Sequence, residues 1–340
     1  MPTPTLGGMT RPLVARLAAL CWLGVLLSAL LVACESRAPS PGPPGPTQVT
    51  ASTASAQVEV ISRQPGVRRL VAIGDLHGDL AATRAALRLA GVVDATDRWV
   101  GGKTVVVQTG DFLDRGDQER AIIDLLERLR KEARSAGGAV HVLHGNHELM
   151  NVAGDLRYVS PSGFREFADR AAAVRGDPSV AHVPEQQLGR FAAFRPGGSY
   201  ARKLADHPVV LVVGDTVFVH GGLLPKHVRY GIDRMNREVA AWLLGQSAVG
   251  ARLVSTRDSP VWVRHYADRP DEADCRMLGE TLALLKTVRM VAGHTTKSTI
   301  TPACDEQIWL IDVGMAAYAG GEPEVLEITA KAVRPLRQEP

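Results

Sequence analysis

The stretch that decides the fold is Gly110-Asp111-Phe112-Leu113-Asp114-Arg115-Gly116. It follows Thr104-Val105-Val106-Val107, and such an apolar β-branched run predicts a buried strand. Glycine lets the backbone turn sharply where the strand ends. Two carboxylates and one guanidinium are therefore expected at the carboxyl end of a strand, where α/β proteins bind their ligands. Taken alone, the heptapeptide is also compatible with a surface turn held by an internal salt bridge.

Four other stretches repeat this pattern, in which a short apolar run ends in glycine beside Asp, Asn or His. They are Gly74-Asp75-Leu76-His77-Gly78-Asp79, Gly145-Asn146-His147-Glu148, His220-Gly221-Gly222 and Gly293-His294-Thr295. Oxygen and imidazole ligands without thiolates suit hard and borderline divalent metals. Five repeats of the pattern favour a metal site over five unrelated turns.

In this order, the motifs GDLHGD, GDFLDRGD, GNHE, HGG and GH resemble the phosphoprotein phosphatase (PPP) branch of the calcineurin-like metallophosphoesterases, over roughly residues 68–330. The segments SPVWVR (259–264) and IDVGM (311–315) are similar to the Shewanella-like, or bacterial-like, subgroup. The resemblance implies an α/β fold in which a β-sandwich is flanked by helices in four layers, αββα. Residues 149–207 lack long apolar runs and contain several prolines and glycines, so they predict a mostly helical insertion with short helices. Because this insertion stands between two ligand motifs, we expect it to lie over the site.

The resemblance further implies two divalent metal ions, with Mn²⁺ expected and Fe or Zn as alternatives. Two such ions can clamp the attacking and leaving oxygens of a displacement at phosphorus and activate water as the nucleophile. His144 stands where many PPP enzymes carry Arg, which leaves the details of ligation open. The implied ligands are Asp75 and His77 for the first ion, Asp111 as the bridge, and Asn146, His220 and His294 for the second.

Four more residues have catalytic roles by the same resemblance. Arg115 would bind phosphoryl oxygens, because its planar fork matches phosphate. Arg264 would be a second phosphate ligand, although a surface salt bridge is the alternative for it. His147 would protonate the leaving oxygen, and Asp114 would orient its imidazole. We expect Glu148 to support the turn.

The amino-terminal segment, residues 1–33, is typical of a lipoprotein signal peptide. Arg11 and Arg16 precede an apolar stretch and the small residue Ala33, after which comes Cys34. We expect cleavage before Cys34 and lipidation of its thiol, with a plain signal peptide or an uncleaved anchor as alternatives. Glu35 favours an outer-membrane destination. The expected location is the bacterial cell envelope, with a lipid anchor at the outer membrane or periplasmic face.

Composition sets the remaining domain limits. Residues 34–66 begin with a stretch rich in Pro, Ser, Thr, Ala and Gly and predict a disordered tether. Residues 67–332 alternate strands and helices and form the expected metallophosphoesterase domain, with 333–340 as a tail. The net charge of +3 is spread along the chain and does not indicate nucleic-acid binding.

Apolar periodicity predicts the elements of this domain. We expect strands at 70–73, 104–107, 140–143, 209–213, 216–219, 288–292, 308–312 and 324–328, and helices at 80–89 with Asp79 as cap, 117–135, 164–174, 186–194, 234–244 and 275–286.

Two cysteines are left for the folded domain if Cys21 is removed with the signal and Cys34 carries lipid. An exported domain meets an oxidising compartment. We therefore predict a disulfide between Cys275 and Cys304. Two separate buried thiols are the alternative.

The expected function is that of a di-metal phosphomonoesterase acting on a phosphorylated protein, at tyrosine or at serine and threonine, or on a small phosphate ester. An alternative is a nucleotide or dinucleoside polyphosphate hydrolase. Those branches usually end in Gly-His-x-His, whereas this chain has Gly293-His294-Thr295-Thr296. An inactive envelope lipoprotein that binds a partner is the alternative from another class.

Overall fold

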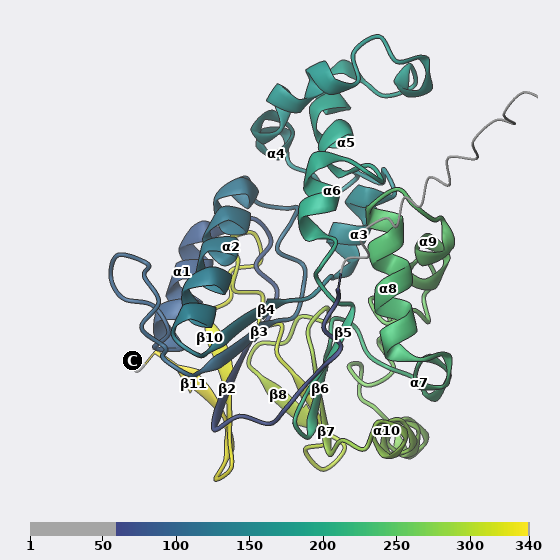
Figure 1. Cartoon of the computed structure of the whole chain (residues 1–340). Coiled ribbons are helices and arrows are strands. Elements are labelled where there is room, and N and C mark those ends of the chain that lie inside the picture. Colours follow the sequence, from purple (N-terminus) through teal and green to yellow (C-terminus); the bar gives the residue numbers. More distant parts are fainter. Residues whose placement is uncertain (1–58, 339–340) are drawn as a thin grey trace, which may run out of the picture. The chain divides into compact units, whose positions relative to one another are not determined.

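Strand β3 (Val105–Gln108) is buried along its whole length and forms the middle of a parallel trio with β2 (Arg69–Ile73) and β4 (Ala139–Val142). Parallel strands covered on both faces are typically continuous apolar runs, as here. The computed structural model describes residues 59–338 (Figure 1). The predicted signal peptide, Cys34 and the tether up to residue 58 lie outside the described residues.

The first sheet has five strands in the order β11-β10-β2-β3-β4. Strand β10 (Glu324–Thr329) runs antiparallel to β2, and β11 (Val333–Arg337) runs antiparallel to β10. The prediction that residues 333–340 are a tail is therefore wrong for 333–337, which form the edge of this sheet. Arg334 bonds Glu327 at 2.8 Å and Arg337 bonds Glu324 at 2.8 Å, so cross-strand ion pairs hold this edge.

The second sheet has six strands in the order β1-β5-β6-β7-β9-β8, with β6, β7 and β9 parallel. Its edge strand β1 pairs with β5, so the ordered domain begins before residue 67 and the predicted end of the tether at 66 is wrong. The strands are β1 (Arg63–Gln64), β5 (Val210–Val213), β6 (Thr216–Val219), β7 (Arg289–Ala292), β8 (Thr301–Ala303) and β9 (Ile308–Leu310).

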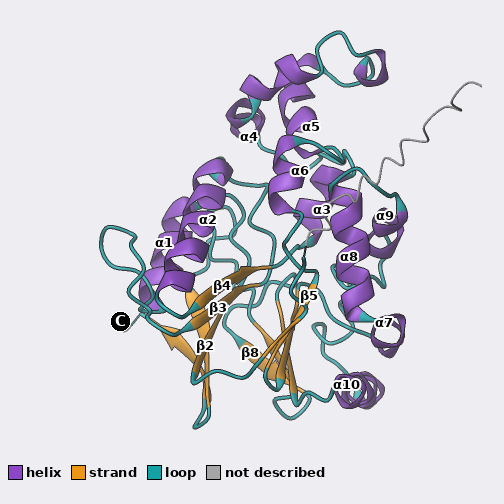
Figure 2. Ribbon diagram, in the orientation of Figure 1, coloured by secondary structure: helices purple, strands orange, loops and turns teal. Residues whose placement is uncertain are grey.

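Helices cover the outer faces of the two sheets, which confirms the predicted αββα layering (Figure 2). Helices α1 (Leu80–Leu89) and α2 (Glu119–Ser135) lie beside the five-stranded sheet. None of the helices within residues 59–338 is both long and apolar enough to cross a membrane. The helices beside the six-stranded sheet are α7 (Pro225–Tyr230), α8 (Ile232–Leu243) and α10 (Glu272–Leu285), with α9 (Val249–Val254) against α8.

The capping residues determine where the helices α1 and α10 begin. The Asp79 side chain accepts a hydrogen bond from the Ala82 amide at 2.9 Å, as predicted for α1. Helix α2 begins at Glu119, two residues later than predicted. Helix α10 begins at Glu272, three residues earlier than predicted, because Asp271 caps it through a capping box.

The regular elements of the insertion are helices and 3₁₀ turns, and α4 and α5 lie at the top of Figure 1. The single helix predicted over 164–174 is divided at Phe167, whose backbone leaves the helical conformation. A small apolar cluster around Val174 and Leu188 holds the outer part of the insertion together. Helix α3 (Asn146–Val152) leads into the insertion. The elements that follow are α4 (Pro161–Glu166), α5 (Leu188–Phe194), α6 (Ser199–Leu204) and the 3₁₀ turns Ala168–Ala173, Pro178–Val180 and Glu185–Gln187.

The predicted disulfide between Cys275 and Cys304 is confirmed, with the two Cα atoms 5.3 Å apart. It joins α10 to the turn between β8 and β9, at the outer side of the six-stranded sheet. Neither cysteine lies in a motif at the strand ends.

Reduction of this disulfide is expected to destabilise the protein without removing activity at room temperature. Closing a loop of 29 residues should contribute about 2–4 kcal/mol, mainly by restricting the unfolded chain. Thermal unfolding with and without reductant measures the effect, and the double variant Cys275→Ser/Cys304→Ser is the control that reductant should not change. Equal melting temperatures for the oxidised and reduced protein would contradict the prediction.

Candidate active site

Five motif residues follow parallel strands that end at the same place, where the two sheets meet. Asp75, Asp111 and Asn146 follow β2, β3 and β4 of the first sheet, and His220 and His294 follow β6 and β7 of the second. The carboxyl ends of parallel strands are the usual ligand-binding edge of an α/β sheet. The fold thus gathers residues from distant parts of the sequence at one point.

Asp111 lies at the centre of this cluster. Its Oδ2 atom is 3.2 Å from Nε2 of His220 and 3.8 Å from Nε2 of both His77 and His147. Two buried groups share Asp111, one with His77 and His147 and one with His220 and His294; within each group the ligand atoms lie within 4.8 Å of one another. A shared carboxylate between two such groups is the arrangement that a bridging ligand requires.

Backbone carbonyls orient the imidazoles of the cluster. Nδ1 of His77 lies 3.1 Å from the Leu113 carbonyl, and Nδ1 of His220 lies 3.0 Å from the Thr109 carbonyl. Protonated Nδ1 atoms can donate to these carbonyls, which leaves each Nε2 as a metal ligand. Nε2 of His294 is buried without a partner among the described residues, as expected of a ligand atom.

The charges of the cluster also fit a cation. Burial raises the pKa of Asp75 well above its usual value, and repulsion from Asp312 and Asp111 raises it further. Burial favours the neutral acid of Asp111 as well, but His220 and His147 outweigh it and hold its pKa well below the usual value. Burial, with a smaller contribution from His220, lowers the pKa of His294 to about 2, so its imidazole stays neutral. A neutral His294 imidazole beside an ionised Asp111 carboxylate supplies donor atoms that suit a divalent metal.

The turn after β3 has an unusual backbone. Asp111, Asp114 and Arg115 have φ angles of 56°, 67° and 71°, in the left-handed region. Gly110 is required because a Cβ atom there would lie 2.2 Å from the Gly145 amide nitrogen. Non-glycine residues in this region cost free energy and cluster at functional sites.

Glu148 holds this turn in place, as predicted. Its carboxylate accepts hydrogen bonds from the amides of Asp111, Phe112, Leu113 and Gly145 at 2.7–3.0 Å. The turn and the amino end of α3 are thereby joined by one buried side chain.

His147 forms a buried pair with Asp114, with Nδ1 2.7 Å from Oδ2. Its Nε2 faces Asp111 and the cavity. Burial opposes protonation, but the carboxylates of Asp111 and Asp114 raise the pKa of His147 to about 9. An imidazolium ion has no free ligand nitrogen, so this environment suits a proton donor better than a metal ligand.

A cavity of about 210 Å³ opens over the cluster. The exposed Arg115 lines it, with its guanidinium 4.2 Å from the ring centre of Tyr158 and 5.4 Å from that of Tyr318. The exposed Arg264 also lines it and donates to the Thr295 hydroxyl at 2.7 Å. All ten predicted site residues therefore surround one cavity or support its lining: Asp75, His77, Asp111, Asp114, Arg115, Asn146, His147, His220, Arg264 and His294.

Four further residues at the site were not predicted. Asp312 follows β9 as Asp75 follows β2. An aspartate directly after the apolar run 308–311 was the signal that could have identified it, although no glycine stands beside it. Tyr158 and Tyr318 stand alone in their loops, and Arg190 lies 76 residues from its partner Asp114, so no local pattern marks them. His144 is buried away from the cluster, against His207.

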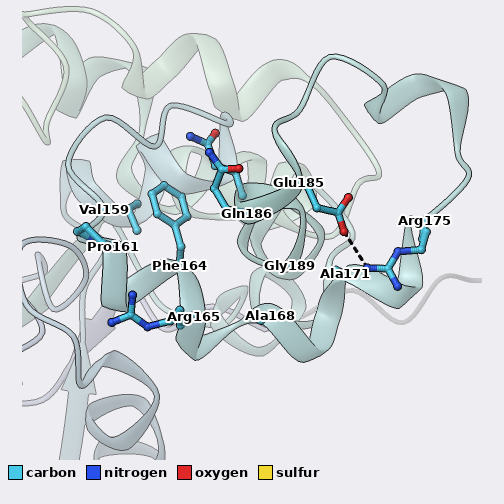
Figure 3. Close-up of a pocket in the computed structure, with 11 residues that line it drawn as sticks. Val159, Pro161, Phe164, Arg165, Ala168, Ala171, Arg175, Glu185, Gln186 and Gly189 are labelled. Carbon is cyan, nitrogen blue, oxygen red and sulfur yellow. Dashed lines mark hydrogen bonds and ion pairs between the residues drawn. The ribbon is translucent and has the colours of Figure 1, made fainter.

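A second pocket, of about 620 Å³, lies in the insertion (Figure 3). Phe164, Val159 and Pro161 line one part, and an ion pair of 2.8 Å joins Arg175 to Glu185 at another. None of the candidate metal ligands lines this pocket. The chemistry therefore belongs to the cavity between the sheets.

The chain belongs to the calcineurin-like phosphoesterase family, whose pattern residues 68–244 match. It is 41% identical to Shewanella-like protein phosphatase 2 of Arabidopsis thaliana, in an alignment that covers 81% of this chain and 78% of that protein. It is 27% identical to Shewanella-like protein phosphatase 1 of Plasmodium berghei, over 79% of this chain and 74% of the relative.

Solved structures support the same fold. The cold-active protein-tyrosine phosphatase of a psychrophilic Shewanella species superposes with a TM-score of 0.63 at 22% identity, over 83% of this chain and 82% of that one. The chain is thus a metal-dependent phosphoesterase whose candidate ligands are those of the strand-end cluster.

Removal of metal should abolish activity and lower the melting temperature, because ligands that bind only the folded state stabilise it. Elemental analysis should find two divalent ions in the chain, and Mn²⁺ should restore activity after chelation. His220→Ala should lose metal, whereas His265→Ala, which removes an exposed histidine outside the cluster, is the matched control. Fully active protein with no stoichiometric metal would refute this prediction.

Proposed function

We propose that the chain is a di-metal protein phosphatase that prefers phosphotyrosine. The observation that carries the proposal is the buried cluster around Asp111, with the His147–Asp114 pair and Arg115 at its rim. The names of the relatives, protein phosphatases in two organisms and a protein-tyrosine phosphatase by fold, support the same substrate class.

Two ions bound here, which we infer to be Mn²⁺ with Fe or Zn as alternatives, would supply positive charge for the phosphoryl oxygens and activate a water for attack. Asp75 and His77 would hold one ion and Asn146, His220 and His294 the other, with Asp111 between them. The Oδ1 atom of Asn146 lies 3.0 Å from Nε2 of His220, which supports a shared position for these two ligands.

The arginines would bind the phosphoryl group. Arg115 makes no ion pair with a carboxylate within residues 59–338, and the faces of Tyr158 and Tyr318 limit its movement. Its fork is therefore free for two phosphoryl oxygens. Arg264, in the loop between α9 and α10, would contribute a second set of donors. Its Nη1 bonds the His294 carbonyl at 3.1 Å, which fixes its position.

His147 would act as the general acid. As the bond from phosphorus to the leaving oxygen breaks, the proton on Nε2 moves to that oxygen, and the imidazole is left neutral. Asp114 holds Nδ1 and keeps the ring directed at the cavity. A group with its pKa near 9 remains protonated at neutral pH and can donate to a poor leaving group.

Aromatic side chains around the cavity support phosphotyrosine as the preferred residue. Tyr158 and Tyr318 lie beside Arg115, and Trp262 also lines the cavity, with its ring beside His294. A phosphorylated tyrosine ring could pack against Tyr318, which is half exposed, while its phosphate reaches Arg115.

We also infer export to the bacterial cell envelope with a lipid on Cys34, at the outer membrane or periplasmic face. The disulfide between Cys275 and Cys304 supports it, since disulfides persist in oxidising compartments. Membrane fractionation of full-length protein tests this inference: Cys34→Ser should move from the membrane to the soluble fraction.

His147→Ala is expected to lower kcat by about 10²–10⁴-fold for phenyl phosphate, since that leaving group needs a proton. The loss for p-nitrophenyl phosphate should be clearly smaller, because p-nitrophenolate leaves unaided. In the native protein kcat should fall as the pH rises towards 9, where the imidazole loses its proton. Asp114→Asn should move this decline to lower pH, because one of the carboxylates that raise the pKa is gone. Equal losses for both leaving groups would remove His147 from this role.

Turnover of matched peptides tests the substrate class after manganese loading. We expect a phosphotyrosyl peptide to be hydrolysed faster than phosphoseryl or phosphothreonyl peptides, and nucleotides or dinucleoside polyphosphates to be poor substrates. Tyr318→Ala should reduce kcat/KM for the phosphotyrosyl peptide by about 2–10-fold, the value of one aromatic contact. Tyr230→Ala, in α7 outside the cavity, is the matched control. Preferred hydrolysis of a dinucleoside polyphosphate would contradict the proposal, and no hydrolysis of any ester by metal-loaded protein would favour a binding lipoprotein.

A further inference from the structure

Arg190, in α5 of the insertion, is a charged side chain with no exposed surface. Its guanidinium donates to Asn151 Oδ1 at 2.7 Å, to Asp114 Oδ1 at 2.9 Å and to Glu119 Oε1 at 3.0 Å, with a further contact to the second oxygen of Glu119. Buried charges occur in proteins when they are paired and hydrogen-bonded, and this fork meets both conditions.

Two aromatic rings of the insertion pack against this guanidinium. The ring centres of Phe167 and Phe194 each lie 5.1 Å from the guanidinium carbon and 5.0 Å from each other. Gly189 allows α5 to approach closely, because a Cβ atom there would lie 2.2 Å from the Phe167 carbonyl oxygen. Packing against the two rings and hydrogen bonds to Asn151, Asp114 and Glu119 therefore hold the Arg190 side chain in one position.

The contacts continue from Arg190 to the site. Oδ1 of Asp114 accepts from Arg190 and from Asn151, each at 2.9 Å, while Oδ2 bonds Nδ1 of His147 at 2.7 Å. With both oxygens engaged, the carboxylate cannot rotate. Asn151 also donates to the His147 carbonyl at 2.9 Å, so the same group of residues holds the backbone and the ring of His147.

We propose that Arg190 is a positioning residue through which the insertion sets the direction of the His147 imidazole. Arg190 does not line the cavity and reaches the substrate only through Asp114 and His147. The inference rests on the proposed role of His147 as general acid. If Arg190 served stability alone, its loss would lower the melting temperature and leave the dependence on the leaving group unchanged.

The experiment compares kcat for phenyl phosphate and p-nitrophenyl phosphate in metal-loaded protein. Arg190→Lys keeps the charge but cannot reproduce the fork. We expect it to reduce kcat for phenyl phosphate by about 10–100-fold, the effect of a misplaced catalytic group, with KM little changed. The loss for p-nitrophenyl phosphate should be several times smaller. Arg130→Lys is the matched control, since Arg130 pairs with Glu127 at 2.8 Å and Asp206 at 2.6 Å on the far end of α2.

Two further variants distinguish a positioning role of Arg190 from a purely structural one. In the His147→Ala background, Arg190→Lys should no longer change the ratio of the two rates, because residues that act as a unit are not additive. Asn151→Ala removes one of the two donors to Oδ1 of Asp114 and one acceptor of Arg190, and it leaves every charge in place. It should shift the ratio in the same direction even if Arg190→Lys does not fold.

The positioning role is overturned if His147→Ala affects the two substrates unequally while Arg190→Lys and Asn151→Ala affect them equally, as Arg130→Lys does. In that outcome the proposed function stands. If His147→Ala itself affects both substrates equally, the general-acid role fails, and the positioning role fails with it.

Discussion

Repulsion between the carboxylates of Asp75, Asp111 and Asp312 is the constraint on which the site depends. All three are buried where the sheets meet, and burial together with the neighbouring charges raises the pKa of Asp75. Like charges in a low-dielectric interior are costly unless a cation or several donors compensate them. The amide of His294 and the surrounding imidazoles compensate in part, and divalent ions would complete the balance. The same buried carboxylates therefore determine both the stability of this region and its ability to bind metal ions.

The sequence was sufficient for the parts of the structure that local patterns encode. The dipeptides Gly-Asp, Gly-Asn and His-Gly identified the metal-ligand cluster from the sequence, because each of them comes directly after an apolar run that predicts a strand. Strand β11 escaped prediction because Val333-Arg334-Pro335-Leu336-Arg337 contains the charges and the proline that edge strands tolerate. Only its register against β10, which places Arg334 opposite Glu327, reveals it as part of the sheet.

Residues that act across long distances could not be predicted from spacing. Arg190 lies in a segment correctly expected to be helical, but its partners Asp114 and Glu119 belong to another part of the fold. Tyr158 reaches the cavity from a loop that has no periodic pattern. Such contacts depend on how the insertion packs against the sheets, and single-sequence periodicity contains no information about that packing.

The division of the ligands between two sheets determines when the site can come into existence. Asp75 and the amide of His294 bond although they are 219 residues apart, and β10, near the end of the chain, completes the sheet that starts with β2. Contacts of such sequence separation form late, because closing long loops is entropically costly. The complete ligand set therefore arises only after nearly the whole domain has been synthesised and folded. Metal binding therefore cannot direct the early folding steps and can only stabilise the fold once it has formed. If the protein were cut between the two sheets, neither half would contain the complete ligand set.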